Sequence, residues 1–337
     1  MKNPRFTLVT AGMVAALALA ACGNESGGSS GSDPASDTAG GGSDGGEQMQ
    51  VALVSKGFQH QFWQAVNTGA QEAADELNVD LTFDGPASET EVDAQLQMLR
   101  AAIERGPDAI GYAALDPEAC VPLLEEAQAN DIPVVQFDAS CDSEVPLNIS
   151  KTDSVVAGAL AADHMAELID NTGEVAIVGH SQINSTGVER RDGFVNQMEA
   201  EYPDIDVVDI QYGDGDHLKS ADIAKAIIAS NPDLAGLYGT NEGSAIGIVN
   251  AVNELGMEPG ELTVIGFDSG QAQIDAIKSG LMAGAITQDP KSIGRLTVES
   301  AVKAANGEEV EPVLDTGSFW YDQSNIDDPD IQEKLYQ

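Results

Sequence analysis

The sequence alternates short apolar runs with longer segments of helical period, and this alternation limits the folds that the chain can adopt. In the longer segments, apolar residues recur every three or four positions, as in an amphipathic helix. The short runs lie at residues 50–54, 79–83, 109–112 and 132–136, and the helical segments lie at 61–77, 89–105 and 117–130. Strands and helices in such alternation predict βαβ units, which build a parallel sheet covered by helices on both faces.

The same pattern restarts after a break near residues 148–153. Its apolar runs lie at residues 175–178, 205–208, 234–238 and 262–266, and a helical segment follows each of them. Two α/β lobes, each a doubly wound, Rossmann-like parallel sheet, are the simplest interpretation. No low-complexity linker separates the two sets, so we expect short crossing strands to form a hinge. The first lobe is expected to comprise residues 49–152 plus 289–315, and the second residues 153–288 plus 316–337.

The N-terminus predicts export. Lys2 and Arg5 precede an uncharged apolar segment that ends at Ala21 and is shorter than the about 20 residues of a bilayer span. Residues 1–21 are therefore interpreted as a secretory signal. The sequence Leu19-Ala20-Ala21-Cys22 resembles the bacterial lipobox, in which the cysteine is lipidated after cleavage. An ordinary signal peptide cut after Ala21 is the alternative.

Residues 22–48 consist mainly of Gly, Ser, Asp, Ala and Thr. Such a segment buries too little apolar surface to order itself, so we expect a flexible tether. Together with a lipid at Cys22, the tether predicts a bacterial protein on the outer side of the cell membrane. The lipid is its only expected attachment to the membrane.

Composition excludes two classes of partner. Asp plus Glu number 56 against 15 Lys plus Arg, which gives a formal net charge of -41. Phosphate groups repel such a polyanion, so non-specific nucleic-acid binding is not expected. Adsorption to an anionic membrane by charge alone is excluded for the same reason. We expect a monomer in solution.

Two cysteines, Cys120 and Cys141, remain beyond the signal region. Outside the cytoplasm such a pair is readily oxidised, so we expect a disulfide. Closure of a loop of about 20 residues would add on the order of 3 kcal/mol of stability in the chain-entropy model. Two buried free thiols are the alternative.

Candidate ligand contacts follow the apolar runs, because ligands of parallel α/β sheets bind beyond the carboxyl ends of the strands. The residues at these positions are rich in groups that bind hydroxyls and poor in catalytic arrangements. The candidates for ligand binding are Lys56, His60, Phe62, Trp63, Asp138, Asn241, Asp268 and Gln288.

Taken in order, these strand ends resemble the ribose-binding type of periplasmic solute-binding protein, over about residues 51–320. The motifs that carry the resemblance are Phe62-Trp63, Phe137-Asp138, Thr240-Asn241-Glu242, Val264-Ile265-Gly266-Phe267-Asp268 and Ile286-Thr287-Gln288. The resemblance implies the type I periplasmic-binding-protein fold, with a ligand cleft between the lobes, and a role in an ABC importer.

The resemblance also implies a role for most of the candidates. Residues that match Phe62 and Trp63 stack on the sugar ring in this family. Those that match Asp138, Asn241, Asp268 and Gln288 bond its hydroxyls. His60 stands where the family usually places an asparagine.

The chain departs from the ribose binders at two arginine positions, which are Ala139 and Val188 here. Arg190 and Arg191 lie close to the second position but are interpreted as helix residues. This departure argues against ribose itself, and Lys56 is expected to compensate. Lys56, Asp84-Gly85-Pro86 and the cysteine pair resemble the subgroup that takes rhamnose, the furanosyl autoinducer and related polyols.

The chemistry of the candidates supports the same ligand class without the resemblance. Aromatic rings suit the C–H faces of a sugar, and carboxylates and amides suit its rim of hydroxyls. Each candidate also has a structural interpretation. Phe62 and Trp63 suit core packing, and Asp138, Asn241 and Asp268 suit helix or turn caps. His180 and His217 follow strand ends without a partner pattern, and His164 is interpreted as structural.

We therefore expect a substrate-binding protein that takes a small neutral sugar or polyol and closes by a hinge motion, with an ABC permease as its partner. No nucleophile elbow, P-loop or metal-ligand spacing occurs, so no cofactor, metal or catalysis is expected. A ligand sensor and a secreted carbohydrate-active enzyme with two carboxylates remain the alternatives.

Overall fold

The structure, a computed structural model, describes residues 48–336 and contains two six-stranded sheets. The expected signal peptide, Cys22 and the expected tether, up to residue 47, lie outside the described residues. The strand order is β11-β5-β4-β3-β1-β2 in the first sheet and β12-β10-β9-β8-β6-β7 in the second. All neighbouring strands are parallel except β10 and β12. The predicted fold of two doubly wound lobes is confirmed, and we call them the first and second lobe.

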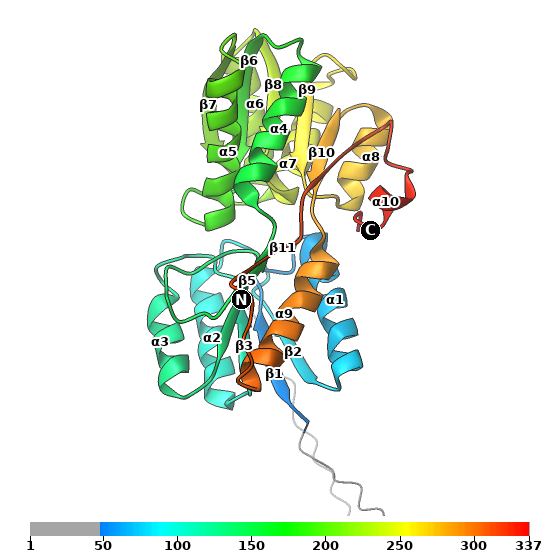
Figure 1. Cartoon of the computed structure of the whole chain (residues 1–337). Coiled ribbons are helices and arrows are strands. Elements are labelled where there is room, and N and C mark those ends of the chain that lie inside the picture. Colours follow the sequence, from blue (N-terminus) through cyan, green and yellow to red (C-terminus); the bar gives the residue numbers. More distant parts are fainter. Residues whose placement is uncertain (1–47, 337) are drawn as a thin grey trace, which may run out of the picture. The chain divides into compact units, whose positions relative to one another are not determined.

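The first lobe has two helices on each face of its sheet (Figure 1). Its strands are β1 (Gln50–Val54), β2 (Asp80–Asp84), β3 (Ala109–Tyr112), β4 (Val134–Phe137), β5 (Ile149–Lys151) and β11 (Val313–Asp315). The helices α1 (Gln61–Leu77) and α9 (Pro290–Ala305) cover one face, and α2 (Val92–Arg105) and α3 (Val121–Ala129) cover the other.

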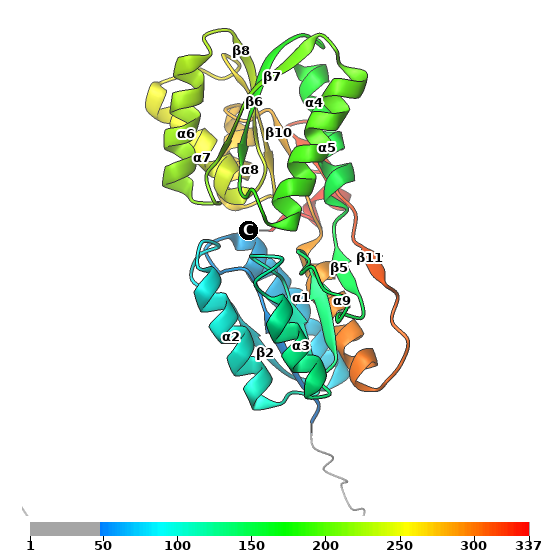
Figure 2. The ribbon, with the colours of Figure 1, turned by 90° about the vertical axis from the view of Figure 1, so that its left-hand side faces the viewer.

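The second lobe repeats this layering (Figure 2). Its strands are β6 (Gly173–Gly179), β7 (Ile205–Tyr212), β8 (Leu234–Gly239), β9 (Thr263–Phe267), β10 (Gly284–Thr287) and β12 (Phe319–Asp322). One face carries α4 (Ser154–Leu168) and α5 (Ser185–Glu201). The other carries α6 (His217–Ser230), α7 (Glu242–Leu255) and α8 (Gln271–Ser279), and the short α10 (Pro329–Gln332) follows β12.

The chain passes between the lobes after β5, after β10 and after β11, so that α9 and β11 return to the first lobe. Short crossing strands were expected at the hinge, but the sequence did not predict the positions of β5 and β11. They have only three residues each and pair with one another beside the crossing points. Such short strands carry no periodic signal, and β11 pairs with a strand far away in the sequence.

Side-chain caps explain where α4, α6 and α7 of the second lobe and α9 of the first lobe begin. The carboxylates of Asp153, Asp216 and Asp289 and the amide oxygen of Asn241 accept hydrogen bonds from backbone N–H groups of the first helical turn. Prediction was wrong at the start of α2, which begins at Val92 and not at Glu89. The preceding residues form a loop instead, because the Ser88 hydroxyl and the Glu91 carboxylate accept from nearby backbone N–H groups.

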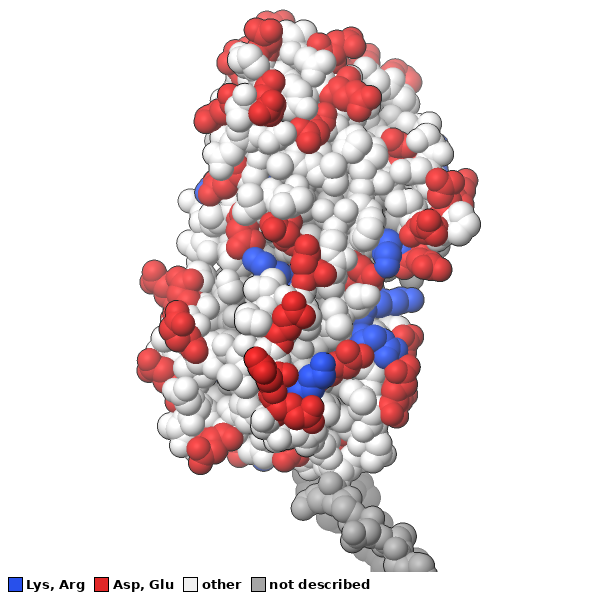
Figure 3. All heavy atoms as spheres, viewed as in Figure 1, with Lys and Arg blue, Asp and Glu red and all other residues white. Residues whose placement is uncertain are grey.

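The surface is strongly acidic (Figure 3). Asp and Glu side chains lie over both lobes, and the few Lys and Arg side chains lie among them. Among residues 48–336, no helix is both long enough and apolar enough to cross a bilayer. In the first lobe, Cys120 and Cys141 are buried and joined by a disulfide.

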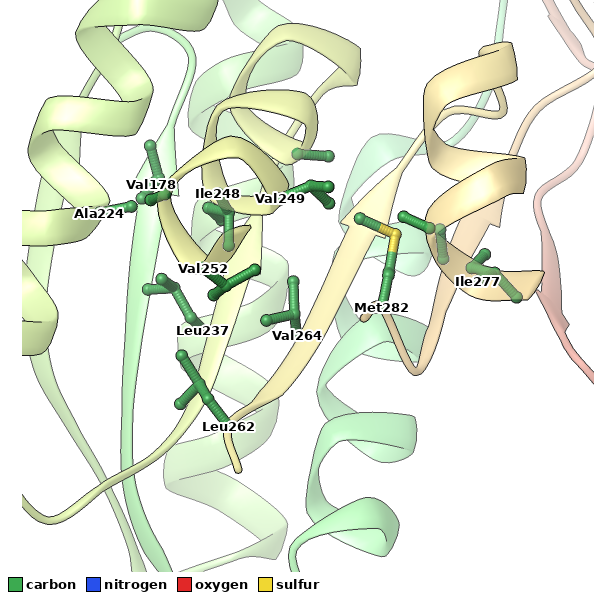
Figure 4. Packing of buried hydrophobic residues seen from close by; sticks show 14 of the residues in the cluster. Val178, Ala224, Leu237, Ile248, Val249, Val252, Leu262, Val264, Ile277 and Met282 are labelled. Carbon is green, nitrogen blue, oxygen red and sulfur yellow. The ribbon is translucent and has the colours of Figure 1, made fainter. Parts of the chain in front are cut away.

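Aliphatic side chains fill the space between each sheet and its helices. Figure 4 shows this packing in the second lobe, where Leu237 and Val264 on the sheet meet Ile248 and Val252 of α7. The sequences of these strands are continuous apolar runs because helices cover both faces of the sheet. Full burial of each such side chain contributes about 1.5–3 kcal/mol.

A buried glutamine ties together the carboxyl ends of β1 and β3, which border the candidate site. The Gln95 amide donates to the carbonyls of Ser55 and Ala113, both at 2.8 Å. Its oxygen accepts from the Tyr112 hydroxyl at 2.7 Å and from the Leu115 N–H at 3.1 Å. All four partners are held by one fully buried side chain.

We predict that Gln95→Leu lowers the free energy of unfolding by about 3 kcal/mol, because buried polar groups lose their partners. Gln97→Leu on the exposed side of the same helix is the matched control and should change it by less than about 0.5 kcal/mol. Urea unfolding of both variants measures the difference. Equal stability of the two variants would contradict the assigned role of Gln95.

Candidate functional site

All the ligand contacts predicted from the sequence line one small cavity, to which both lobes contribute. Three further side chains complete its wall. The lining residues are Lys56, His60, Phe62, Trp63, Glu89, Asp138, His180, Arg190, Asn241, Asp268 and Gln288. The cavity volume is about 10 Å³, which is room for about one water molecule. Glu89 and His180 also line a neighbouring groove of about 380 Å³.

Asp138 and Asp268 occupy equivalent positions in the two lobes. Asp138 follows β4 and Asp268 follows β9, and both residues are at least 96% buried. Both have a left-handed backbone, with φ of 57° and 79°. This conformation is uncommon outside glycine, and it persists where the surrounding structure enforces it, often at functional sites.

In the first lobe, a lysine and two aromatic rings surround Asp138. Lys56 Nζ lies 3.0 Å from Asp138 Oδ2 and 5.5 Å from the centre of the Trp63 ring. Phe62 and Trp63, at the start of α1, meet edge to face with their centroids 4.9 Å apart. Both rings belong to the core of the lobe and to the cavity wall at once. Phe62 and Trp63 therefore pack in the core of the lobe and also line the cavity.

In the second lobe, Asp268 organises its neighbours. Its Oδ1 accepts from Gln288 Nε2 at 2.6 Å, and its Oδ2 accepts from the Glu242 N–H at 3.0 Å. Asn241 caps α7 through its Oδ1, which accepts from the Ser244 N–H at 2.8 Å. Asn241 thus combines the capping role with a place in the cavity wall.

Glu89 is a cavity residue that the sequence analysis missed. Its Oε1 accepts from Trp63 Nε1 at 2.8 Å. Burial acts to raise the pKa of Glu89, but the charges of Lys56, His60 and His180 and the Trp63 hydrogen bond outweigh it and lower the pKa to about 2. Glu89 was missed because the sequence pattern placed it in a helix, whereas it lies in the loop before α2.

Two buried histidines, His60 and His180, face the cavity. Burial lowers the pKa of His60, and it lowers that of His180 well below the usual value, helped there by the positive charges of Arg190 and Lys56. His180 Nδ1 lies 2.9 Å from the Thr240 hydroxyl, and its Nε2 lies 3.2 Å from that of Thr186. The other two described histidines lie outside the cavity wall. The His217 ring lies 5.7 Å from that of His60, and His164 stacks on Trp320 at 4.0 Å.

Arg190 was interpreted only as a helix residue, and it lines the cavity from α5. Its guanidinium carbon lies 3.7 Å from the centre of the Phe267 ring, and its Nη1 donates to the Thr240 carbonyl at 3.0 Å. The helical spacing could have revealed it, because Thr186, Arg190 and Phe194 lie four residues apart and all are buried.

Several buried polar atoms of the cavity wall have no protein partner within the described part of the chain. They are His60 Nδ1, Arg190 Nε and Gln288 Oε1; Asp138 Oδ2 has only its ion pair with Lys56, at 3.0 Å. Buried polar groups are nearly always hydrogen-bonded, because an unpaired one costs about 1–3 kcal/mol. Three such atoms around one cavity indicate a place built to receive a polar guest. Within the same residues, no group of three or more His, Cys, Asp or Glu side chains is arranged to hold a metal ion.

A buried carboxylate, that of Glu242, lies beside the cavity at the start of α7. It accepts from the N–H groups of Gln61 at 3.0 Å and Phe62 at 3.2 Å. Burial raises the pKa of Glu242 to about 7, and the negative charges of Asp268 and Glu89 act in the same direction.

Comparison with known proteins assigns the chain to one protein family. A family model described as the periplasmic binding protein domain matches residues 51–309. The chain is 26% identical to the D-allose-binding periplasmic protein of Escherichia coli over 275 residues, which cover 78% of this chain and 87% of that protein. It is 24% identical to the xylitol-binding protein of Mycolicibacterium smegmatis over 238 residues, covering 69% and 66%.

Solved structures agree in fold. A carbohydrate transporter solute-binding protein from Agrobacterium radiobacter, in complex with D-arabinose, matches with a TM-score of 0.83 and 29% identity, covering 86% of this chain and 99% of that one. An ABC transporter solute-binding protein from Agrobacterium vitis, bound with α-D-tagatopyranose, matches with a TM-score of 0.83 and 31% identity, covering 86% and 100%.

The raised pKa of Glu242 predicts a pH-dependent stability. The folded chain holds this proton up to about pH 7, whereas the ordinary value is 4.5. The contribution of Glu242 is therefore complete below about pH 4.5 and is lost as the pH rises through about 7. Between pH 4.5 and 8, the wild type should lose about 3 kcal/mol more than Glu242→Gln, which stays neutral. Urea unfolding at both pH values measures this, and equal losses would contradict the assigned pKa.

Proposed function

Because the chain belongs to the periplasmic binding protein domain family, we propose that it binds a small neutral sugar or polyol between its lobes and presents it to an ABC importer. The observation that carries this proposal is the set of unpartnered buried atoms His60 Nδ1, Arg190 Nε and Gln288 Oε1 around a single cavity. Hydroxyl groups, which both donate and accept hydrogen bonds, match such a mixture of donors and acceptors.

The other cavity residues suit the same ligand. Phe62 and Trp63 offer apolar surface for the C–H face of a sugar ring, at little cost in side-chain entropy. The carboxylates of Asp138 and Asp268 accept from hydroxyls, and a hydrogen bond to a charged group contributes about 1.5–3 kcal/mol. A sugar that lacks one of the matched hydroxyls would leave a buried group unpaired, which is how such a site selects its ligand.

Binding requires the lobes to separate, because the cavity has room for only about one water molecule. We infer a hinge motion about the segments that follow β5, β10 and β11. A ligand that contacts Asp138 on one lobe and Asp268 on the other favours the closed arrangement over the open one. Only this difference in affinity shifts the equilibrium.

The alternatives differ in which molecule is bound and in whether it is transported, sensed or converted. The same cavity suits a sensor for a furanosyl autoinducer or another polyol. A carbohydrate-active enzyme would use two of the carboxylates for catalysis. Lipid anchoring at Cys22 and attachment through residues 22–48 stay proposals that rest on the sequence motif.

The proposal is tested by a thermal-shift screen of residues 48–337 produced without the signal peptide. The panel holds D-allose, D-arabinose, D-tagatose, L-rhamnose, D-ribose and xylitol, with amino acids as controls. A bound sugar should stabilise the fold by RT ln(1 + [L]/Kd), which is about 2.7 kcal/mol at a hundredfold excess over Kd. Chromatography of the same mixtures should recover the sugar unchanged. Shifts confined to amino acids, or conversion of the sugar, would overturn the proposal.

Single carboxylate removals test the site itself. Asp138→Ala and Asp268→Ala should each weaken binding of the sugar selected by the screen by about tenfold to a hundredfold, because a charged acceptor is lost. Asp275→Ala, on the exposed side of α8, is the matched control and should bind as the wild type does. Titration calorimetry gives the affinities, and circular dichroism verifies the fold. Wild-type affinity in both cavity variants would exclude this site.

A further inference from the structure

Each lobe supplies a cap for a helix of the other lobe. The Glu242 carboxylate, on α7 of the second lobe, accepts from the Gln61 and Phe62 N–H groups at the start of α1 in the first lobe. In return, the Gln61 side-chain oxygen accepts from the Gln271 N–H at 2.6 Å, at the start of α8 in the second lobe. Gln61 therefore takes part in both contacts, once through its backbone and once through its side chain.

Within the described residues, no side chain of α1 accepts from the Gln61 or Phe62 N–H group, and none of α8 accepts from that of Gln271. At the start of α8 the Gln273 side chain accepts from the Gly270 N–H instead, at 3.2 Å. The first four N–H groups of a helix have no partner within the helix and need one from outside. The N-cap residue of α1, His60, makes no side-chain capping bond, and the N-cap residue of α8, Gly270, has no side chain. A Cβ at Gly270 would lie 2.9 Å from Glu242 Oε1 and 3.1 Å from Gln61 Oε1. The glycine thus permits the close approach of both capping groups.

Both caps adjoin the cavity without lining it. The Glu242 N–H donates to Asp268 Oδ2, and the same aspartate accepts from Gln288 in the cavity wall. Gln61 directly precedes Phe62 and Trp63, which also line the cavity. Neither Glu242 nor Gln61 is among the lining residues. The caps can therefore form only when the two lobes bring the cavity walls together.

We propose that Glu242 and Gln61 form a reciprocal cross-lobe latch that sets the affinity and residence time of the ligand without touching it. This inference rests on the proposed function, because it concerns the closure of the lobes that accompanies ligand binding. The Glu242 side-chain oxygens provide acceptors for two N–H groups at the start of α1 that have no partner within the helix. The latch thus adds to closure a stabilisation that is independent of the identity of the sugar.

The kinetics distinguish a latch from a ligand contact or from a purely structural role. Because the caps stabilise the closed arrangement and not the open one that the ligand enters, their loss should speed dissociation and leave association unchanged. Loss of an N-cap corresponds to about a tenfold change in an equilibrium constant. Glu242→Ala and Gln61→Ala should therefore each raise the dissociation rate constant, and Kd with it, about tenfold. The double variant should show a combined effect smaller than the product of the two, since Gln61 and Glu242 share one contact region.

Stopped-flow fluorescence with the sugar that the thermal screen selects gives both rate constants. Gln64→Ala on the exposed side of α1 and Asn253→Ala on the exposed side of α7 are the matched controls and should keep wild-type rates. Wild-type dissociation in Glu242→Ala and Gln61→Ala overturns the latch. An equal fall in the association rate constant also overturns the latch, because it would indicate damage to the ligand entrance or to the fold.

Amide exchange separates failure of the latch from failure of the proposed function. If no sugar of the panel binds, the proposed function fails, and the latch is judged on the ligand-free protein. Glu242→Ala should then accelerate exchange at the Gln61 and Phe62 amides, and Gln61→Ala should accelerate it at the Gln271 amide, because these N–H groups lose their acceptors. Unchanged exchange at all of these amides overturns the latch whatever the ligand.

Discussion

The cavity and the contact between the lobes both depend on the hydrogen bonds that the carboxylate of Asp268 accepts. One of its oxygens holds Gln288 in the cavity wall, and the other holds the backbone N–H of Glu242. The Glu242 side chain then reaches α1 of the first lobe. A hydroxyl bound at Asp268 would therefore join the same hydrogen-bonded chain that connects the two lobes. Recognition and closure would share one buried group, which is what a closing binding protein requires.

The two sheets explain why the polar groups meet at all. Parallel strands end at a common edge, and each lobe places an aspartate with a left-handed backbone just beyond one of its central strands. The cavity between these edges contains the carboxylates of Glu89, Asp138 and Asp268 together with the cations of Lys56 and Arg190. Opposite charges thus nearly balance inside, although the protein as a whole has a net charge of -41. Such a balance suits an uncharged, hydroxylated ligand.

Much of the fold could be predicted from the sequence, because apolar runs and helical periods report burial directly. The strand-end rule also led to Asp138, Asn241 and Asp268, which lie around one cavity. Glu89 was missed for a physical reason, whereas the four-residue spacing along α5 could have indicated Arg190. Glu89 lies in an irregular loop whose course depends on side-chain caps, and Arg190 faces inward from the middle of a helix. The contact between Glu242 and α1 joins residues 180 positions apart, and no local pattern reveals such a contact.

The central claim is that both lobes hold one sugar at the same time. A crystal structure of residues 48–337 grown with the sugar selected by thermal shift tests this most directly. The account predicts a single sugar whose hydroxyls lie within hydrogen-bond distance of both Asp138 and Asp268, with a ring face against Phe62 or Trp63. A sugar bound to one lobe only, or at a surface away from these residues, would contradict the account.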